Sequence, residues 1–179
     1  MHRLFVAIRP PQPVLDLLLD TMEGMASLRW QDADQLHITL RFIGEVERPL
    51  AEDIAAALAT IRFDPFELRI AGVGRFDHRR GGVLWAGVEP RAPLAALAAK
   101  VERACVSVGI APEKRVFHPH VTLARWSGGS GEGLRPFVEL NAGLRSEPFA
   151  VERFALFESH LGHGGALHEM IADYPLRPA

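Results

Sequence analysis

The sequence predicts an α+β domain in which two lobes share one core. Segments with the apolar periodicity of strands alternate along the chain with segments that have the periodicity of helices. The order of elements in the first half roughly recurs in the second half, and no change of composition marks a linker between them. We therefore expect residues 1–179 to form a single domain of two lobes, with largely antiparallel sheets and helices packed outside.

In the first half, the order is strand, helix, strand, helix. The opening apolar run ends at Arg9 and Pro10, far short of a signal peptide or a membrane span, so we expect no membrane association. A proline-rich stretch then precedes an apolar spacing typical of a helix, and a β-branched segment that Gly44 ends precedes an alanine-rich helix. The four segments are residues 3–8, 14–25, 36–43 and 50–61.

The second half repeats strands and helices around a longer amphipathic helix. Two strands at 66–70 and 83–88 are expected to form a hairpin or a meander through a turn at 79–82. A glycine-rich loop is expected at 128–131. The remaining predicted elements are helices at 93–108 and 134–140 and strands at 117–124, 148–157 and 168–173.

The composition suits a packed globular protein. Hydrophobic residues make up 48% of the 179 residues, which is enough to bury a sizeable core. Cys105 is the only cysteine, which excludes an internal disulfide and leads us to expect a reducing, cytoplasmic setting. The formal net charge of −2 provides no general attraction to nucleic acid, so an RNA contact has to be local or involve only an RNA end.

Two of the four threonines follow a histidine by two residues. The segments are Leu36-His37-Ile38-Thr39-Leu40 and Pro119-His120-Val121-Thr122-Leu123. With eight histidines in the chain, chance would produce such a pair about 1% of the time. In a strand, alternate side chains share a face, so each motif offers one imidazole and one hydroxyl together. If the two strands lie side by side, these four groups surround a space the size of a phosphate.

Two imidazoles and two hydroxyls suit the opening of a cyclic phosphate. The reaction needs a base that activates water and an acid that protonates the departing ribose oxygen. An ordinary imidazole pKa near 6.5 allows one histidine to be neutral while the other is protonated. Threonine hydroxyls can donate hydrogen bonds to the non-bridging oxygens as negative charge builds there. This chemistry requires no metal and no other cofactor.

Around these motifs the sequence resembles the two-histidine phosphoesterase superfamily. Within it, the chain is similar to the bacterial and archaeal RNA 2′,3′-cyclic phosphodiesterases historically called 2′-5′ RNA ligases. The likeness spans nearly the whole chain. It rests on residues 3–8, 36–44, 83–88, 117–125 and 154–159.

The resemblance implies a pseudo-symmetric bilobal fold whose two sheets face a central cleft that holds both motifs. It implies a metal-independent enzyme that hydrolyses a terminal 2′,3′-cyclic phosphate, on RNA or on a small cyclic nucleotide, to a 2′-phosphate. The same centre run in reverse would join such an end to a 5′-hydroxyl. The expected protein is a monomer.

By the same resemblance, His37 is the proton donor and His120 the acceptor, although pseudo-symmetry lets the two exchange roles. Thr39 and Thr122 bind the phosphate. Phe42 and Arg125 are expected to contact the terminal nucleotide. Strict strand alternation puts Arg125 on the face opposite to His120 and Thr122, so it reaches the cleft only if the strand has ended or bulged before it. The family often carries a tyrosine where this chain has residues 165–168, and this departure puts in doubt an aromatic contact from the C-terminal segment.

The sequence leaves two other functions open. A metal-dependent hydrolase could use the histidines at 118, 120, 160, 163 and 168, although such a site leaves both threonines unexplained. A non-catalytic module could bind RNA ends or nucleotides in the same cleft. The glycine-rich stretches at 72–74 and 128–131 lack a phosphate-loop lysine and are interpreted as turns.

Overall fold

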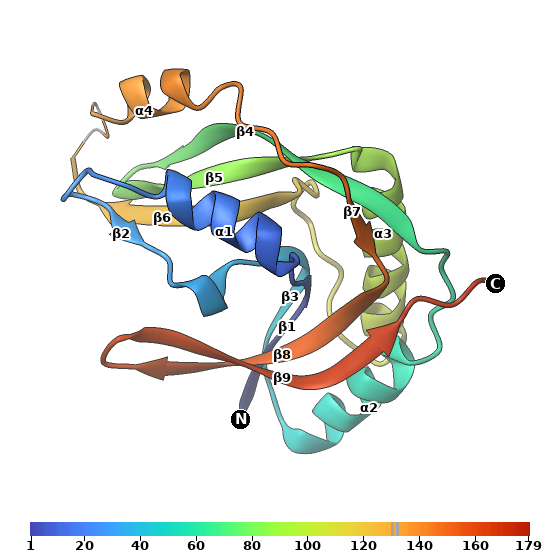
Figure 1. Cartoon of the computed structure of the whole chain (residues 1–179). Helices are drawn as coiled ribbons and strands as arrows, with labels where there is room; N and C mark the ends of the chain where they lie inside the picture. The colour runs from blue at the N-terminus through green and yellow to red at the C-terminus, as the bar shows by residue number, and fades with distance from the viewer. Residues whose placement is uncertain (130, 132) are drawn as a thin grey trace.

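The computed structural model describes residues 1–129, 131 and 133–179 and has the α+β architecture that the sequence predicts (Figure 1). Its strands belong to one curled sheet in which the paired strands run antiparallel. The strands are β1 (His2–Ile8), β2 (Arg29–Trp30), β3 (Ile38–Val46), β4 (Phe66–His78), β5 (Gly81–Glu89), β6 (His120–Ser127), β7 (Phe149–Val151), β8 (Arg153–Gly162) and β9 (Gly165–Pro175). The helices are α1 (Gln12–Thr21), the short 3-10 helix η1 (Ala33–Gln35), α2 (Arg48–Leu58), α3 (Arg91–Ser107) and α4 (Leu134–Leu140).

The two predicted lobes are the two halves of this sheet. The strand order is β7-β4-β5-β6-β3-β1-β8-β9, with β2 paired to β6. The halves join between β6 and β3 at one registered pair, Ile38 with Val121. In Figure 1 the β4–β5–β6 half lies above the half that contains β1, β8 and β9. The junction therefore lies at the ends of the two segments that carry the histidine-x-threonine motifs.

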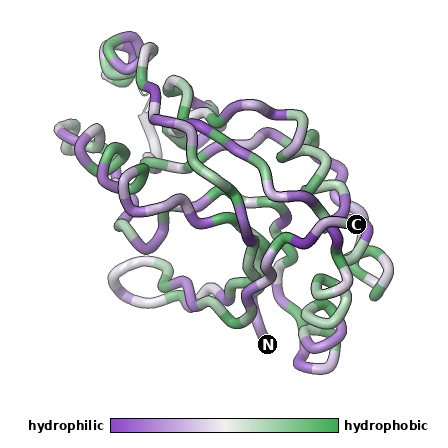
Figure 2. Tube along the Cα trace, turned by 45° about the vertical axis from the view of Figure 1, so that its right-hand side comes forward, coloured by the Kyte–Doolittle hydropathy of each residue, from purple (hydrophilic) through white to green (hydrophobic). Residues whose placement is uncertain are grey.

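The main core lies on one face of the sheet, under α1, α2 and α3. From β1 it contains Leu4, Val6 and Ile8, which are nearly fully buried together with apolar residues of the three helices. Phe5 and Ala7 point to the opposite face and pack in a separate small cluster with two residues of β8. We call this opposite face the second face. Because β1 is buried on both faces, its sequence is a continuous apolar run, whereas other segments alternate hydrophobic and hydrophilic residues (Figure 2).

The element boundaries differ from the predicted ones where local conformation interrupts the apolar pattern. Helix α1 ends at Thr21 because Met22 leaves the helical region with a ψ of 69°, and Gly24 and Met25 then adopt left-handed φ angles of 74° and 57°. Strand β4 continues past its predicted end to His78 through a β-bulge between Ile70 and Val73.

Other differences concern short or irregular elements. The predicted strand at 148–157 is divided into β7 and β8 at residue 152, β6 begins three residues later than predicted, and β9 is longer. Neither β2 nor η1 was predicted from the pattern. Position 130 of the predicted loop at 128–131 lies outside the described residues. None of the described helices combines the length and the apolar character needed to cross a bilayer.

Candidate active site

The two histidine-x-threonine motifs meet where the halves of the sheet join. Ile38 of β3 pairs with Val121 of β6, and both side chains are completely buried in the main core. In an antiparallel ladder the residues that flank such a pair also lie opposite one another, and their side chains point to the other face. These flanking residues, called the motif residues below, are His37, Thr39, His120 and Thr122. All four are half-buried, so two imidazoles and two hydroxyls share one region of the second face.

Backbone carbonyls hold both imidazoles. Nδ1 of His120 lies 2.7 Å from the carbonyl oxygen of His118, two residues earlier, and donates a hydrogen bond to it. His37 makes a backbone hydrogen bond to Gln35, also two residues earlier. With Nδ1 of His120 committed as a donor, Nε2 is the nitrogen that can accept a proton.

Burial keeps both histidines neutral near pH 7. The pKa of His37 is lowered to about 3, first by burial and then by the charge of His168, with smaller effects from His120 and Arg9. The pKa of His120 is also lowered, mainly by burial, with the charges of His118 and Arg125 acting in the same direction. The influence of His120 on His37 is a further sign that the two imidazoles are close.

These shifts predict that the protein loses stability in mild acid. The folded pKa of His37 is below its unfolded value near 6.5, so the unfolded chain binds the extra proton between about pH 6.5 and about pH 3. The free energy of unfolding should therefore be highest above pH 6.5 and fall with decreasing pH, with each such histidine contributing at most about 1.4 kcal/mol per pH unit. Urea denaturation between pH 7 and pH 4.5 measures this slope.

The matched variants are His37→Gln and His163→Gln. The first should flatten the slope, because it removes the group that resists protonation, whereas His163 is exposed in the β8–β9 turn and should leave the slope as it is. Equal slopes in wild type and His37→Gln would contradict this assignment.

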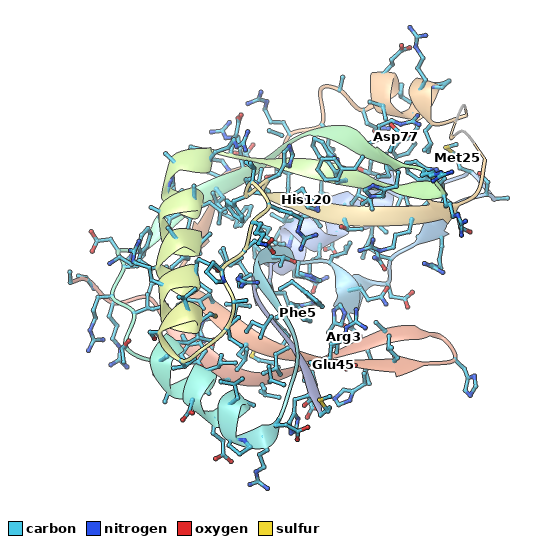
Figure 3. The ribbon with its side chains drawn as sticks, turned by 180° about the vertical axis from the view of Figure 1, so that it is seen from behind. Arg3, Phe5, Met25, Glu45, Asp77 and His120 are labelled. Atoms are coloured by element: carbon cyan, nitrogen blue, oxygen red, sulfur yellow. The ribbon has the colours of Figure 1, made fainter. Side chains whose placement is uncertain are left out.

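Aromatic rings surround each histidine. The ring of Phe5 lies 4.8 Å from that of His37, and that of His168 lies 5.2 Å from it. Around His120, the ring of Phe76 lies 5.3 Å away in a T-shaped contact, His118 lies 5.9 Å away and Trp85 6.2 Å away. Figure 3 shows Phe5 and His120 on facing parts of the two halves.

Sequence reasoning missed these neighbours of the motif residues. Phe76, Trp85 and His168 come from strands whose register cannot be read from local spacing, and Phe5 lies in a continuous apolar run that does not show which face it occupies. In the segment where relatives often carry a tyrosine, the ring of His168 contacts both His37 and Phe5. Gly74 makes room for Trp85, since a Cβ at that position would lie 2.3 Å from the indole ring.

A β-bulge brings Phe42 to the same face as Thr39. Ala7 pairs with Thr39 and Val6 with Arg41, so Leu40 is an extra residue in the ladder. Phe42 consequently lies opposite Phe5 of the second face, with 39% of its surface exposed. The guanidinium of Arg3 lies 5.4 Å from the centre of its ring.

A β-bulge also changes the face of the sheet on which Arg125 lies, in the other half. Trp85 pairs with Thr122 and Leu84 with Ala124, so Leu123 is the extra residue and Arg125 lies opposite Val83. The parity that separated Arg125 from Thr122 in the sequence is thereby reversed. Arg125 is exposed, and its positive charge lowers the pKa of His120. Phe42 and Arg125 each follow their motif threonine by three residues and occupy equivalent positions in the two halves.

The histidines considered for a metal site do not gather in one place. Among the described residues, the group with closely spaced ligand atoms is Glu158, His160 and Glu169 of the β8–β9 hairpin. Glu158 pairs with Leu4, which points into the main core, so this group lies on the face opposite to the motif residues. His168 instead lies beside His37.

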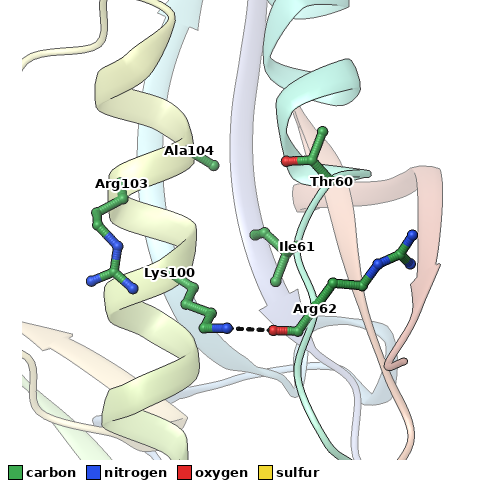
Figure 4. Close-up of a pocket in the computed structure, with 6 residues that line it drawn as sticks. All are labelled: Thr60, Ile61, Arg62, Lys100, Arg103 and Ala104. Carbon is green, nitrogen blue, oxygen red and sulfur yellow. Dashed lines mark hydrogen bonds between the residues drawn. The ribbon is translucent and has the colours of Figure 1, made fainter. Parts of the chain in front are cut away.

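Two surface cavities lie away from the motif residues. One is a basic hollow between the end of α2 and the middle of α3, where Lys100 donates a hydrogen bond to the carbonyl of Arg62 (Figure 4). The other lies between β3 and the segment after α3 and includes Arg41 and Phe42. None of the four motif residues lines either cavity.

The comparisons with known proteins all indicate the same family. The family model described as the 2′-5′ RNA ligase superfamily matches residues 24–163. Three curated relatives are named RNA 2′,3′-cyclic phosphodiesterase. The protein from Aeropyrum pernix is 48% identical over 53% of this chain and 55% of its own length, and that from Geobacillus stearothermophilus is 32% identical over 88% and 50%. The Bacillus subtilis protein is 32% identical over 93% of this chain and 92% of its own length. The chain thus spans about half the length of the first two relatives.

Solved structures agree with these relatives. A crystal structure titled as a phosphoesterase superposes with a TM-score of 0.82 at 26% identity, over 98% of both chains. The structure of Escherichia coli LigT complexed with 3′-AMP has a TM-score of 0.81 at 25% identity, again over 98% of both chains. The whole fold, with both halves of the sheet, is therefore shared with these proteins.

Proposed function

Because the chain belongs to the 2′-5′ RNA ligase superfamily, we propose that it hydrolyses the 2′,3′-cyclic phosphate at an RNA end or of a small cyclic nucleotide to a 2′-phosphate. The observation that carries the proposal is the Ile38–Val121 pair, which puts the side chains of both motifs on one face of the sheet. The names of the relatives support the same substrate class. With a 5′-hydroxyl in place of water, the same centre would join the cyclic-phosphate end to that hydroxyl as the 3′-oxygen leaves.

In the proposed reaction the two histidines act on opposite sides of phosphorus. Nε2 of His120 accepts a proton from water while the water oxygen forms a bond to phosphorus. The bond between phosphorus and the ribose 3′-oxygen breaks, and His37 donates a proton to that oxygen. The phosphate remains on the 2′-oxygen. Thr39 and Thr122 donate hydrogen bonds to the non-bridging oxygens, whose charge increases in the transition state.

The proton on His37 has to be taken up together with the substrate. A pKa of about 3 leaves His37 neutral near pH 7, whereas the anionic phosphodiester beside it favours the protonated form. His120 already donates from Nδ1 to the carbonyl of His118, so its Nε2 is oriented to act as a base. Because His37 bonds to the Gln35 backbone in the same manner, the proposed assignment of His37 as donor and His120 as acceptor comes from the family resemblance.

Phe42 and Arg125 are proposed to contact the terminal nucleotide. Phe42 is a half-exposed ring on the same face as Thr39, and a base can stack on it. The guanidinium of Arg125 is exposed and lies near enough to His120 to affect its pKa, which suits contact with a phosphate or with the face of a base. We further propose one catalytic domain over residues 1–179 that works as a monomer in the cytoplasm, a setting in which Cys105 stays a buried free thiol.

An assay with a 2′,3′-cyclic nucleotide in excess chelator tests the proposal. We expect turnover to persist in chelator and the product to be the 2′-phosphate, because the proposed chemistry uses only side chains of the chain. Chromatography against both monophosphate isomers identifies the product. Activity that disappears with chelator and returns with a metal ion would support a metal-dependent hydrolase instead.

Two further results would also contradict it. A 3′-phosphate product would overturn the proposed regiochemistry. Tight binding of the nucleotide without any product would support a non-catalytic binding module.

A further inference from the structure

His168 reaches the candidate site from a distant part of the chain. It lies on β9 opposite Ser159 of β8, in the hairpin that extends from the lower half of the sheet in Figure 1. Its ring centre lies 5.2 Å from that of His37 and 4.8 Å from that of Phe5, and both contacts are T-shaped. Its Nδ1 atom is buried and has no hydrogen-bond partner among the described residues.

A hydrogen bond of Gln35 links the strand that carries His168 to the segment that carries His37. Its side-chain Nε2 donates a hydrogen bond of 2.7 Å to the carbonyl of Ala166, two residues before His168. Its Oε1 accepts a hydrogen bond of 2.9 Å from the backbone N–H of Asp32, and its backbone carbonyl bonds to His37. One residue therefore fixes the end of η1, the β9 strand and the imidazole of His37 relative to one another.

On the basis of the proposed function, we propose that His168 is a positioning residue for His37. Its ring, anchored through Gln35, packs against the His37 imidazole and holds it in the orientation in which it donates a proton to the departing ribose oxygen. The contact leaves His37 few alternative rotamers, so the donor is in place when the phosphate binds.

The pair also interacts through charge. A proton on one imidazole disfavours a proton on the other, and this effect of His168 is the largest one on His37 after burial. The other charged groups that act on His37 are His120 of β6 and Arg9, which follows β1. His168 thus affects both the orientation of His37 and its protonation.

Two substitutions separate these effects. His168→Ala removes the ring, and we expect kcat to fall about 10-fold to 10²-fold, as for an acid displaced by up to about 1 Å, with KM nearly unchanged. His168→Phe keeps the ring volume but removes the charge, so kcat should be largely retained. In this variant the titration midpoint of His37, followed by NMR of its imidazole protons, should move to higher pH, because one cause that lowers its pKa is gone. His163→Ala, exposed in the same hairpin, should change neither quantity.

The outcomes distinguish this proposal from the proposed function. Wild-type kcat in His168→Ala, or an unchanged His37 midpoint in His168→Phe, would overturn the role of His168. If wild-type protein does not open a cyclic phosphate, the proposed function fails, yet the His37 midpoint still decides whether His168 acts on His37. If His168→Ala does not fold by circular dichroism, His168→Phe, which preserves the packing, supplies the decisive midpoint.

Discussion

Replacement of His120 by alanine should reduce turnover of a 2′,3′-cyclic phosphate by about 10²–10⁴-fold, the usual contribution of one proton transfer. Nε2 of His120 is the proposed acceptor of the proton from water, and methyl hydrogens cannot replace it. Binding should be largely retained, since Thr39, Thr122 and Arg125 remain. Single-turnover kinetics give the chemical step, and titration with a 2′-phosphate product gives the affinity.

The same experiment on His37 gives an internal comparison. His37→Ala should lower the rate by a similar factor, and the double variant should lose much less than the product of the two factors, because both groups act in one transition state. His163→Ala is the control. A His120→Ala variant that keeps the wild-type rate, or one that loses affinity as strongly as turnover, would contradict the assigned role.

Replacement of Arg41 by methionine should destabilise the fold by about 3 kcal/mol, within the range for breaking a buried ion pair. Only 8% of the surface of Arg41 is exposed, and its Nε binds the carboxylate of Glu102 on α3. Its Nη2 donates a hydrogen bond of 2.6 Å to the carbonyl of Ala111, and Nη1 lies 3.7 Å from Glu113. Methionine fills a similar volume but leaves these acceptors without their donor.

Urea denaturation at pH 7 measures the loss, with Arg48→Met as the matched control. Arg48 pairs with Glu52 on the surface of α2, so its replacement should cost less than about 1 kcal/mol. Because Arg41 also holds the segment from Ala111 that leads to His120, kcat should fall in Arg41→Met at temperatures where the protein is still folded. Equal stability of the two variants would show that the Arg41 network adds no more than a surface pair.

The sequence was sufficient for the fold class and for the shared face of each histidine and its threonine, because both depend on local spacing. Strand alternation puts each histidine with its threonine, and the apolar residue between them, Ile38 or Val121, marks the buried side. The side of the sheet that Arg125 occupies was not predictable, since it depends on the bulge at Leu123, which exists only against its partner strand β5.

The contact between His168 and His37 could not be predicted from the sequence for the same reason. It lies 131 positions after His37, and their contact depends on the register of β1, β3, β8 and β9 together. Long-range pairing of this kind leaves no periodic trace in either segment. Helix α1 shows that local spacing can also mislead. Its apolar spacing predicts a helix through Met25, although the backbone has already turned at Gly24.

Phe42 and Arg125, each three residues after a motif threonine, make the two sides of the candidate site chemically different. Around the Ile38–Val121 pair the chain offers matching groups on both sides, much as an isologous dimer would. A phosphorus atom there would meet one imidazole and one hydroxyl from each motif whichever way the ligand was inserted. The two sides differ at Phe42 and Arg125, which are an aromatic ring on one side and a cation on the other. If Phe42 and Arg125 contact the nucleotide as proposed, these two residues would decide the polarity of the bound strand and which ribose oxygen leaves.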